Sequence, residues 1–122
     1  MEVFSRNAYN GTYSLELEGM AGIGIFQTDL STYNSVDISF WYVTEQWENS
    51  DQLLLQYSLD GSNWTTLQSY DRSDNWVNAS YTISDPSILT QNVEIRIFAN
   101  TNNCQNCDWA YIDLTTIQGN CN

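Results

Sequence analysis

The sequence predicts an all-β fold, a two-sheet antiparallel jelly-roll (Greek-key) β-sandwich of about eight strands. Three observations predict it: apolar and polar residues alternate over most of the chain, polar turns interrupt this pattern roughly every ten residues, and helix signals are nearly absent. A chain of 122 residues builds one core, so we expect residues 1–122 to form a single domain.

Each predicted strand is an alternating segment bounded by Gly, Asn, Asp or Ser. At the start of the chain, Tyr13, Leu15 and Leu17 share one face of a strand, and polar side chains share the other. The predicted strands cover residues 13–18, 21–28, 35–44, 51–59, 64–70, 75–83, 92–99 and 108–117.

Two connections define how these strands are joined. Asp60-Gly61 lies between two apolar runs and predicts a hairpin, because both residue types tolerate positive φ. The polar connection 84–91, which contains Pro86, is too long for a tight hairpin and predicts a crossover between the sheets.

The charge balance excludes several functions. The chain has 15 acidic residues against three arginines, Arg6, Arg72 and Arg96, with no Lys and no His, and its net charge is −12. Nucleic acids and anionic membranes are bound through basic side chains, so neither is expected as a partner. Without His, Ser-His-Asp and Cys-His catalysis and His-based metal sites are also excluded. No apolar run is long enough to span a membrane, so no membrane insertion is expected.

Four segments together resemble bacterial jelly-roll carbohydrate-binding modules and the MAM-like domains that share their fold. Residues 7–17 (NAYNGTYSLEL) are similar to the opening strand of these families, and residues 109–117 (WAYIDLTTI) to the closing strand. Residues 36–42 and 58–67 resemble middle strands of accessory domains in secreted hydrolases. The resemblance implies a secreted, extracellular or cell-surface module of a larger protein, with a parent enzyme or adhesin domains in cis. The fold alone does not fix a ligand.

The resembled carbohydrate-binding families carry a structural Ca²⁺ that ties the first strand to the last. By that resemblance Glu2, Asn10 and Asp113 are the candidate ligands, in keeping with the six to eight oxygens that Ca²⁺ requires. Leu114 stands where the family motif has a second acidic residue, so one potential ligand is missing. The alternative is that Asp113 accepts hydrogen bonds from the opening turn.

Sugar recognition combines flat aromatic rings with nearby polar side chains. By alternation, Trp41 points outward on strand 35–44, and Arg96 and Phe98 point outward on strand 92–99, so we expect these three side chains on one exposed sheet. Gln56 and the loop residues Trp47 and Trp76 are expected to extend that surface. Trp64, beside the Asp-Gly turn, is interpreted as a packing residue. The alternative is that loops cover the outward rings as a small second cluster.

Cys104 and Cys107 have C-x-x-C spacing, which also occurs in zinc and redox sites. Zinc requires four ligands, and this chain has three Cys and no His. We therefore expect a Cys104–Cys107 disulfide, as is usual in exported domains. A strand of about ten residues, roughly 33 Å long, separates Cys107 from Cys121, so Cys121 is expected to be free or paired beyond this chain.

The leading hypothesis is a non-catalytic carbohydrate-binding module that targets a secreted enzyme or surface protein to a polysaccharide or oligosaccharide. A MAM-like adhesion or protein-interaction domain is the alternative. The third hypothesis is a small glycosidase, which would need two carboxylates about 5–10 Å apart across a cleft. Glu94 and Asp37 are the one pair that the alternation pattern brings onto one face, so an enzyme is not expected.

Overall fold

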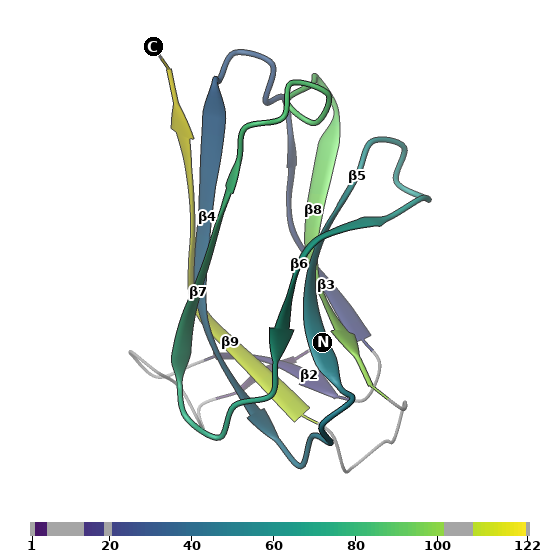
Figure 1. The fold of residues 1–122 in the computed structure, drawn as a ribbon, viewed down its shortest axis with the longest axis vertical. Coiled ribbons are helices and arrows are strands. Elements are labelled where there is room, and N and C mark those ends of the chain that lie inside the picture. The colour runs from purple at the N-terminus through teal and green to yellow at the C-terminus, as the bar shows by residue number, and fades with distance from the viewer. Residues whose placement is uncertain (1, 5–13, 19–20, 102–108, 122) are drawn as a thin grey trace.

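A computed structural model describes residues 2–4, 14–18, 21–101 and 109–121 of the chain as two antiparallel β-sheets packed face to face (Figure 1). The five-stranded sheet has the order β1-β2-β9-β4-β7, and the four-stranded sheet has the order β3-β8-β5-β6. The strands are β1 (Glu2–Phe4), β2 (Ser14–Glu18), β3 (Ala21–Thr28), β4 (Ser35–Glu45), β5 (Gln52–Ser58), β6 (Thr65–Asp71), β7 (Val77–Ile83), β8 (Val93–Asn100) and β9 (Trp109–Asn120). The predicted two-sheet sandwich is therefore confirmed.

Each of the eight predicted ranges corresponds to a strand, β2 to β9. The prediction lacked β1, which pairs with β2 and is only three residues long. Three residues are too few for a period-two pattern to be recognised. No helix long and apolar enough to cross a membrane occurs in the described ranges.

The connections follow the predicted turn chemistry. The segment 84–91 leads from β7 in one sheet to β8 in the other, so the predicted crossover is confirmed. Gly61 has φ of 79°, and it lies in the loop that joins β5 and β6 as a hairpin. This loop covers residues 59–64 and projects from the four-stranded sheet on the side away from the five-stranded sheet (Figure 1).

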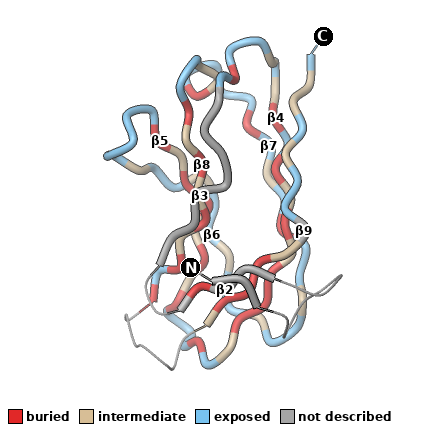
Figure 2. Tube along the Cα trace, turned by 180° about the vertical axis from the view of Figure 1, so that it is seen from behind, coloured by how far each residue is buried: buried red, intermediate tan, exposed pale blue. Residues whose placement is uncertain are grey.

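The core lies between the two sheets and is built from the inward half of each alternation, as the burial colours in Figure 2 indicate. In β4, the inward residues Val36, Ile38, Phe40 and Tyr42 are all buried, as predicted. In β8 the inward set is also buried: Val93, Ile95, Ile97 and Ala99. The outward residues of both strands therefore face away from the core.

Candidate functional site

The most distinctive arrangement on an outward face is in the four-stranded sheet, where Arg96 of β8 lies against two aromatic rings. The guanidinium carbon of Arg96 is 4.2 Å from the ring centroid of Trp64 and 4.6 Å from that of Phe98. Both distances are within the range of a cation–π contact. All three side chains are partly exposed, so the cluster is open to solvent.

Two polar side chains on neighbouring strands fix the position of Arg96. Its Nε donates a hydrogen bond of 2.7 Å to Oε1 of Gln56 on β5, the residue paired with it in the sheet. Nε2 of Gln56 in turn donates to Oγ1 of Thr66 on β6 at 3.1 Å. We call these five residues the Arg96 platform: Gln56, Trp64, Thr66, Arg96 and Phe98.

The strand on the other side of β8 is β3, which places two glycines beside the platform residues. In β3, Gly24 pairs with Arg96 and Gly22 pairs with Phe98. Glycine has no side chain, so nothing from these two positions rises beside the guanidinium or the Phe98 ring.

The β5–β6 hairpin loop holds Trp64 at the platform. Oδ1 of Asp60 accepts hydrogen bonds from the backbone N–H groups of Asn63 at 2.7 Å and Ser62 at 2.8 Å, and Nδ2 of Asn63 donates to Oδ2 at 2.7 Å. These bonds hold the pKa of the Asp60 carboxyl well below its usual range. The loop backbone directly before Trp64 is therefore fixed by the ionised form of one aspartate.

Trp64 belongs to the site, although the sequence analysis assigned it to packing. A two-residue turn at Asp60-Gly61 would pair Trp64 with Tyr57, whose side chain packs on the core. The observed loop is longer, and a bulge lies between Leu55 and Gln56, so Tyr57 pairs with Thr65 and Gln56 with Thr66. This one-residue shift reverses the faces of residues 64–66, as expected for a period of two. Beyond the bulge Leu55 pairs with Gln68, and the rest of β6 keeps the faces that a two-residue turn would give.

The predicted sugar-binding residues separate into three locations. Gln56, Arg96 and Phe98 are together, as predicted. The expectation that Trp41 shares their sheet is wrong, because β4 lies in the five-stranded sheet, where Trp41 pairs with Asn78 of β7 and Asp113 of β9. Alternation gives the face of a residue within its own sheet and does not say which sheet contains the strand.

Trp47 and Trp76 do not extend the platform either. Trp47 is 4% exposed and packs in the core cluster, and among the residues described its Nε1 is a buried N–H without a hydrogen-bond partner. Trp76 precedes β7, at the edge of the five-stranded sheet. The prediction that these two rings join one exposed surface is therefore wrong, because the chain folds one into the core and the other onto the opposite layer.

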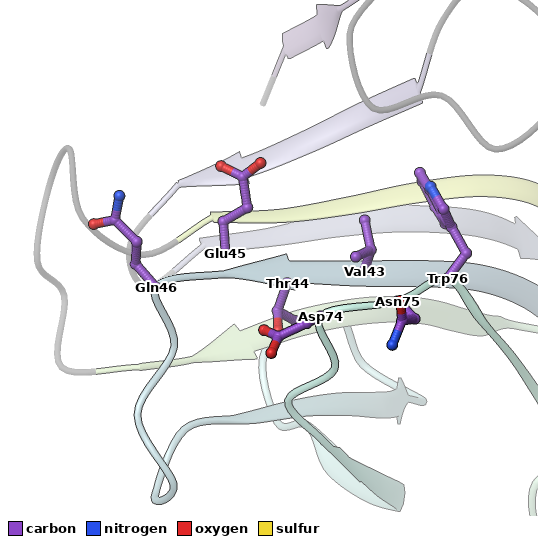
Figure 3. A pocket seen from close by; sticks show the side chains of 7 residues that line it. All are labelled: Val43, Thr44, Glu45, Gln46, Asp74, Asn75 and Trp76. Carbon is purple, nitrogen blue, oxygen red and sulfur yellow. The ribbon is translucent and has the colours of Figure 1, made fainter.

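Trp76 instead lines a separate, open pocket of about 530 Å³ beside the end of β4. Figure 3 shows Val43, Glu45 and Trp76 pointing to one side of β4, and Thr44, Asp74 and Asn75 to the other; Gln46 completes the lining. Thr44 fastens the loop to the strand, since its backbone N–H donates to the carbonyl of Ser73 at 2.8 Å. The carboxylates of Glu45 and Asp74 make this pocket acidic.

The carboxylate pair of the glycosidase alternative is not on one face. Glu94 is on β8 of the four-stranded sheet, and Asp37 is on β4 of the five-stranded sheet. Oδ1 of Asp37 accepts from Oγ1 of Thr82 at 2.6 Å, and Oδ2 accepts from Nδ2 of Asn120 at 2.9 Å. These bonds lower the pKa of Asp37, which does not suit a general acid.

The predicted calcium ligands are only partly within the described residues. Asn10 lies outside them. Glu2 is on β1 and Asp113 is on β9, with β2 between the two strands. In the described ranges no group of three His, Cys, Asp or Glu is arranged to hold a metal ion, and two positions supply too few oxygens for Ca²⁺. The calcium site therefore depends on Asn10 and its neighbours and stays a prediction.

The predicted Cys104–Cys107 disulfide also lies outside the described residues. Cys121, after the end of β9, is an exposed free thiol whose Sγ is 3.5 Å from the carbonyl oxygen of Thr32.

Comparison with solved structures identifies similar sandwiches among carbohydrate-binding modules. The CBM22-1 xylan-binding domain of Paenibacillus barcinonensis Xyn10C has a TM-score of 0.68 at 17% identity, covering 99% of this chain and 81% of that domain. Family 16 Carbohydrate Binding Module-2 has a TM-score of 0.65 at 16% identity, covering 95% and 83%. TmCBM61, solved in complex with β-1,4-galactotriose, has 0.62 at 18% identity, covering 94% and 76%. At these identities the likeness establishes the fold alone.

No protein-family model and no curated protein matches the sequence.

Proposed function

We propose that this chain is a non-catalytic carbohydrate-binding module and that the Arg96 platform binds the sugar. The observation that carries the proposal is the cluster of two partly exposed rings, Trp64 and Phe98, around one fixed guanidinium at an outward sheet face. The similar solved structures include a domain named for binding xylan and a module solved in complex with β-1,4-galactotriose, which supports the same class of ligand.

The chemistry of the platform suits a pyranose. Aromatic rings cover the apolar C–H faces of a sugar, and polar groups beside them bind its hydroxyls. Trp64 and Phe98 supply partly exposed ring surface, and the terminal nitrogens of Arg96 supply hydrogen-bond donors. Gln56 and Thr66 keep the guanidinium in one orientation, so little side-chain entropy is lost on binding.

In this proposal the module acts by local concentration. It holds a linked enzyme or adhesin domain of a secreted protein against polysaccharide, which raises the effective concentration of substrate without any chemistry in the module. A structural Ca²⁺ near the first and last strands remains part of the proposal.

The test compares two partly exposed tryptophans, Trp64 in the hairpin loop beside the four-stranded sheet and Trp41 on the five-stranded sheet. Affinity electrophoresis against soluble xylan, β-1,4-galactan and mannan should retard the wild-type protein on at least one polymer. We expect Trp64→Ala to weaken that retardation by about tenfold or more, because stacking surface is lost. Trp41→Ala is the matched control: it removes a partly exposed ring from the five-stranded sheet and should bind as the wild type does.

Circular dichroism should first establish that both variants are folded. Loss of binding in Trp41→Ala with normal binding in Trp64→Ala would move the site to the other sheet. If no polysaccharide retards the wild type while a protein partner does, the adhesion alternative replaces this proposal.

A further inference from the structure

We propose that Arg96 recognises a carboxylate, so that the ligand of the Arg96 platform is a mostly neutral polysaccharide carrying isolated uronic acid residues. This inference rests on the proposed function and adds the chemical class of the sugar to it.

The hydrogen-bonding state of the guanidinium is the first observation. Nε of Arg96 is used, since it donates to Oε1 of Gln56. In the described part of the chain, no acceptor bonds the two terminal nitrogens, and no ion pair joins Arg96 to an acidic residue. Arg96 therefore keeps its end-on pair of N–H groups for a ligand.

The two rings determine how a ligand can approach. Trp64 and Phe98 contact the guanidinium at 4.2 Å and 4.6 Å, and its Nε edge lies against Gln56. The edge formed by the two terminal nitrogens is what remains. Its parallel N–H groups match the two oxygens of a carboxylate, the partner that a guanidinium binds in bidentate geometry. A neutral hydroxyl uses only part of this geometry.

The second observation is that Arg96 has lost some of its hydration without gaining a counter-charge from any residue that the structure describes. Burial lowers the pKa of Arg96, although the guanidinium remains charged at neutral pH. Glu94 is on the same face of β8, but its carboxylate lies beside Gly61 of the hairpin loop. A Cβ atom at Gly61 would be in van der Waals contact with Oε2 of Glu94. A guanidinium that has no acidic partner among the described residues is available for an anionic ligand.

Arg72 provides the contrast. Its Nη1 donates a hydrogen bond of 3.2 Å to the backbone carbonyl of Trp47, so it fastens a loop to the body of the domain. Arg72 is a structural arginine by this contact, whereas the contacts of Arg96 within the described residues leave its terminal nitrogens for binding.

The net charge of the chain determines how densely charged the ligand can be. At −12 the protein repels a polymer that carries a carboxylate on every residue. One uronic acid held directly against Arg96 gains the short-range contact, and salt screens the remaining acidic side chains beyond roughly 8 Å at physiological ionic strength. The inferred ligand is therefore sparsely charged.

The experiment uses uronic-acid-bearing polysaccharides with different neutral backbones: glucuronoxylan and a glucuronic-acid-bearing arabinogalactan. Each is tested in its native form and after chemical reduction of its carboxyl groups to primary alcohols. Polygalacturonate serves as the densely charged polymer. Isothermal titration calorimetry should give roughly tenfold tighter binding of a native polymer than of its reduced form, the size expected for one hydrogen-bonded ion pair. Polygalacturonate should bind more weakly than the preferred native polymer.

Arg96→Gln tests the residue itself. The readout is the ratio of affinities for the native and reduced forms of one polymer, which should fall from about ten to about one, whatever affinity is lost for both. Arg96→Lys keeps the charge without the bidentate geometry and should give an intermediate ratio.

Equal affinity of the wild-type protein for native and reduced polymers overturns this inference and leaves the proposed function standing. An unchanged ratio in Arg96→Gln also overturns it. If none of these polymers and none of the neutral polysaccharides binds, both proposals fail.

Discussion

The outward faces of the two sheets differ in how far their side chains are exposed to solvent. On the four-stranded sheet, Arg96 and Phe98 of β8 are partly exposed and meet Trp64 from the hairpin loop. On the five-stranded sheet, Tyr111 of β9 pairs with Val43 of β4, and both are outward yet buried, at 0% and 8% exposure. An outward position is therefore not the same as an accessible one.

This difference separates a binding surface from a second packing layer. Tyr111 is fully buried but is not a member of the cluster between the sheets, so it packs on the opposite side of its sheet. The ring of Phe98 instead contacts the Arg96 guanidinium, whose terminal nitrogens make no hydrogen bond to the described residues. Three predictions test this comparison, beginning with the largest expected effect.

The first prediction compares Tyr111→Ala with Phe98→Ala. Removing the fully buried ring should lower the free energy of unfolding by about 3 kcal/mol or more, because it leaves a cavity, whereas removing the partly exposed ring should cost about 1 kcal/mol. Urea denaturation at neutral pH measures both. Phe98→Ala should in addition weaken glycan binding. Equal losses of stability would mean that the two outward faces are covered alike.

The second prediction concerns the hairpin that holds Trp64. Gly61 has φ of 79°, a conformation that costs a residue with a side chain about 1–2 kcal/mol. Gly61→Ala should therefore lower the free energy of unfolding by about that amount, measured by thermal denaturation. Ser62→Ala is the control, because it keeps the backbone N–H that bonds Asp60 and should be nearly neutral. An unchanged free energy of unfolding in Gly61→Ala would contradict the observed turn.

The third and smallest effect is a pH dependence of the same loop. The pKa of Asp60 is lower in the folded protein than in the unfolded chain, so the unfolded state binds more protons as the pH falls. The stability that this carboxylate contributes is present above about pH 4 and is lost as the pH falls below that value. The urea midpoint of the wild type should therefore fall more steeply below about pH 4 than that of Asp60→Asn. Parallel curves would show that Asp60 does not support the loop.

Much of the fold can be predicted from local patterns in the sequence. The alternation in 35–44 and 92–99 identified the inward residues of β4 and β8, because a strand with one buried face must repeat every two residues. The Asp-Gly turn and the crossover at 84–91 were also predictable, since they depend on the conformations of a few adjacent residues.

The candidate site was only half predictable. Gln56, Arg96 and Phe98 were assigned correctly to one surface. Their strands β5 and β8 are neighbours, and the alternation within each strand shows which side chains point outward. Trp41 was assigned to the wrong sheet and Trp47 to the surface instead of the core. Trp64 was interpreted as packing, and the structure places its ring against Arg96. Each error concerns the order of strands or the path and length of a loop, and neither is encoded in the period of the sequence.

By itself the sequence determined that this chain forms a stacked antiparallel sandwich, that its charge disfavours nucleic acid, and that histidine chemistry is absent. The tertiary structure decided which rings meet which guanidinium and which outward side chains stay open to solvent. The physical reason is that alternation is a property of neighbouring residues, whereas a site on a sandwich is made where strands distant in the sequence become neighbours in a sheet.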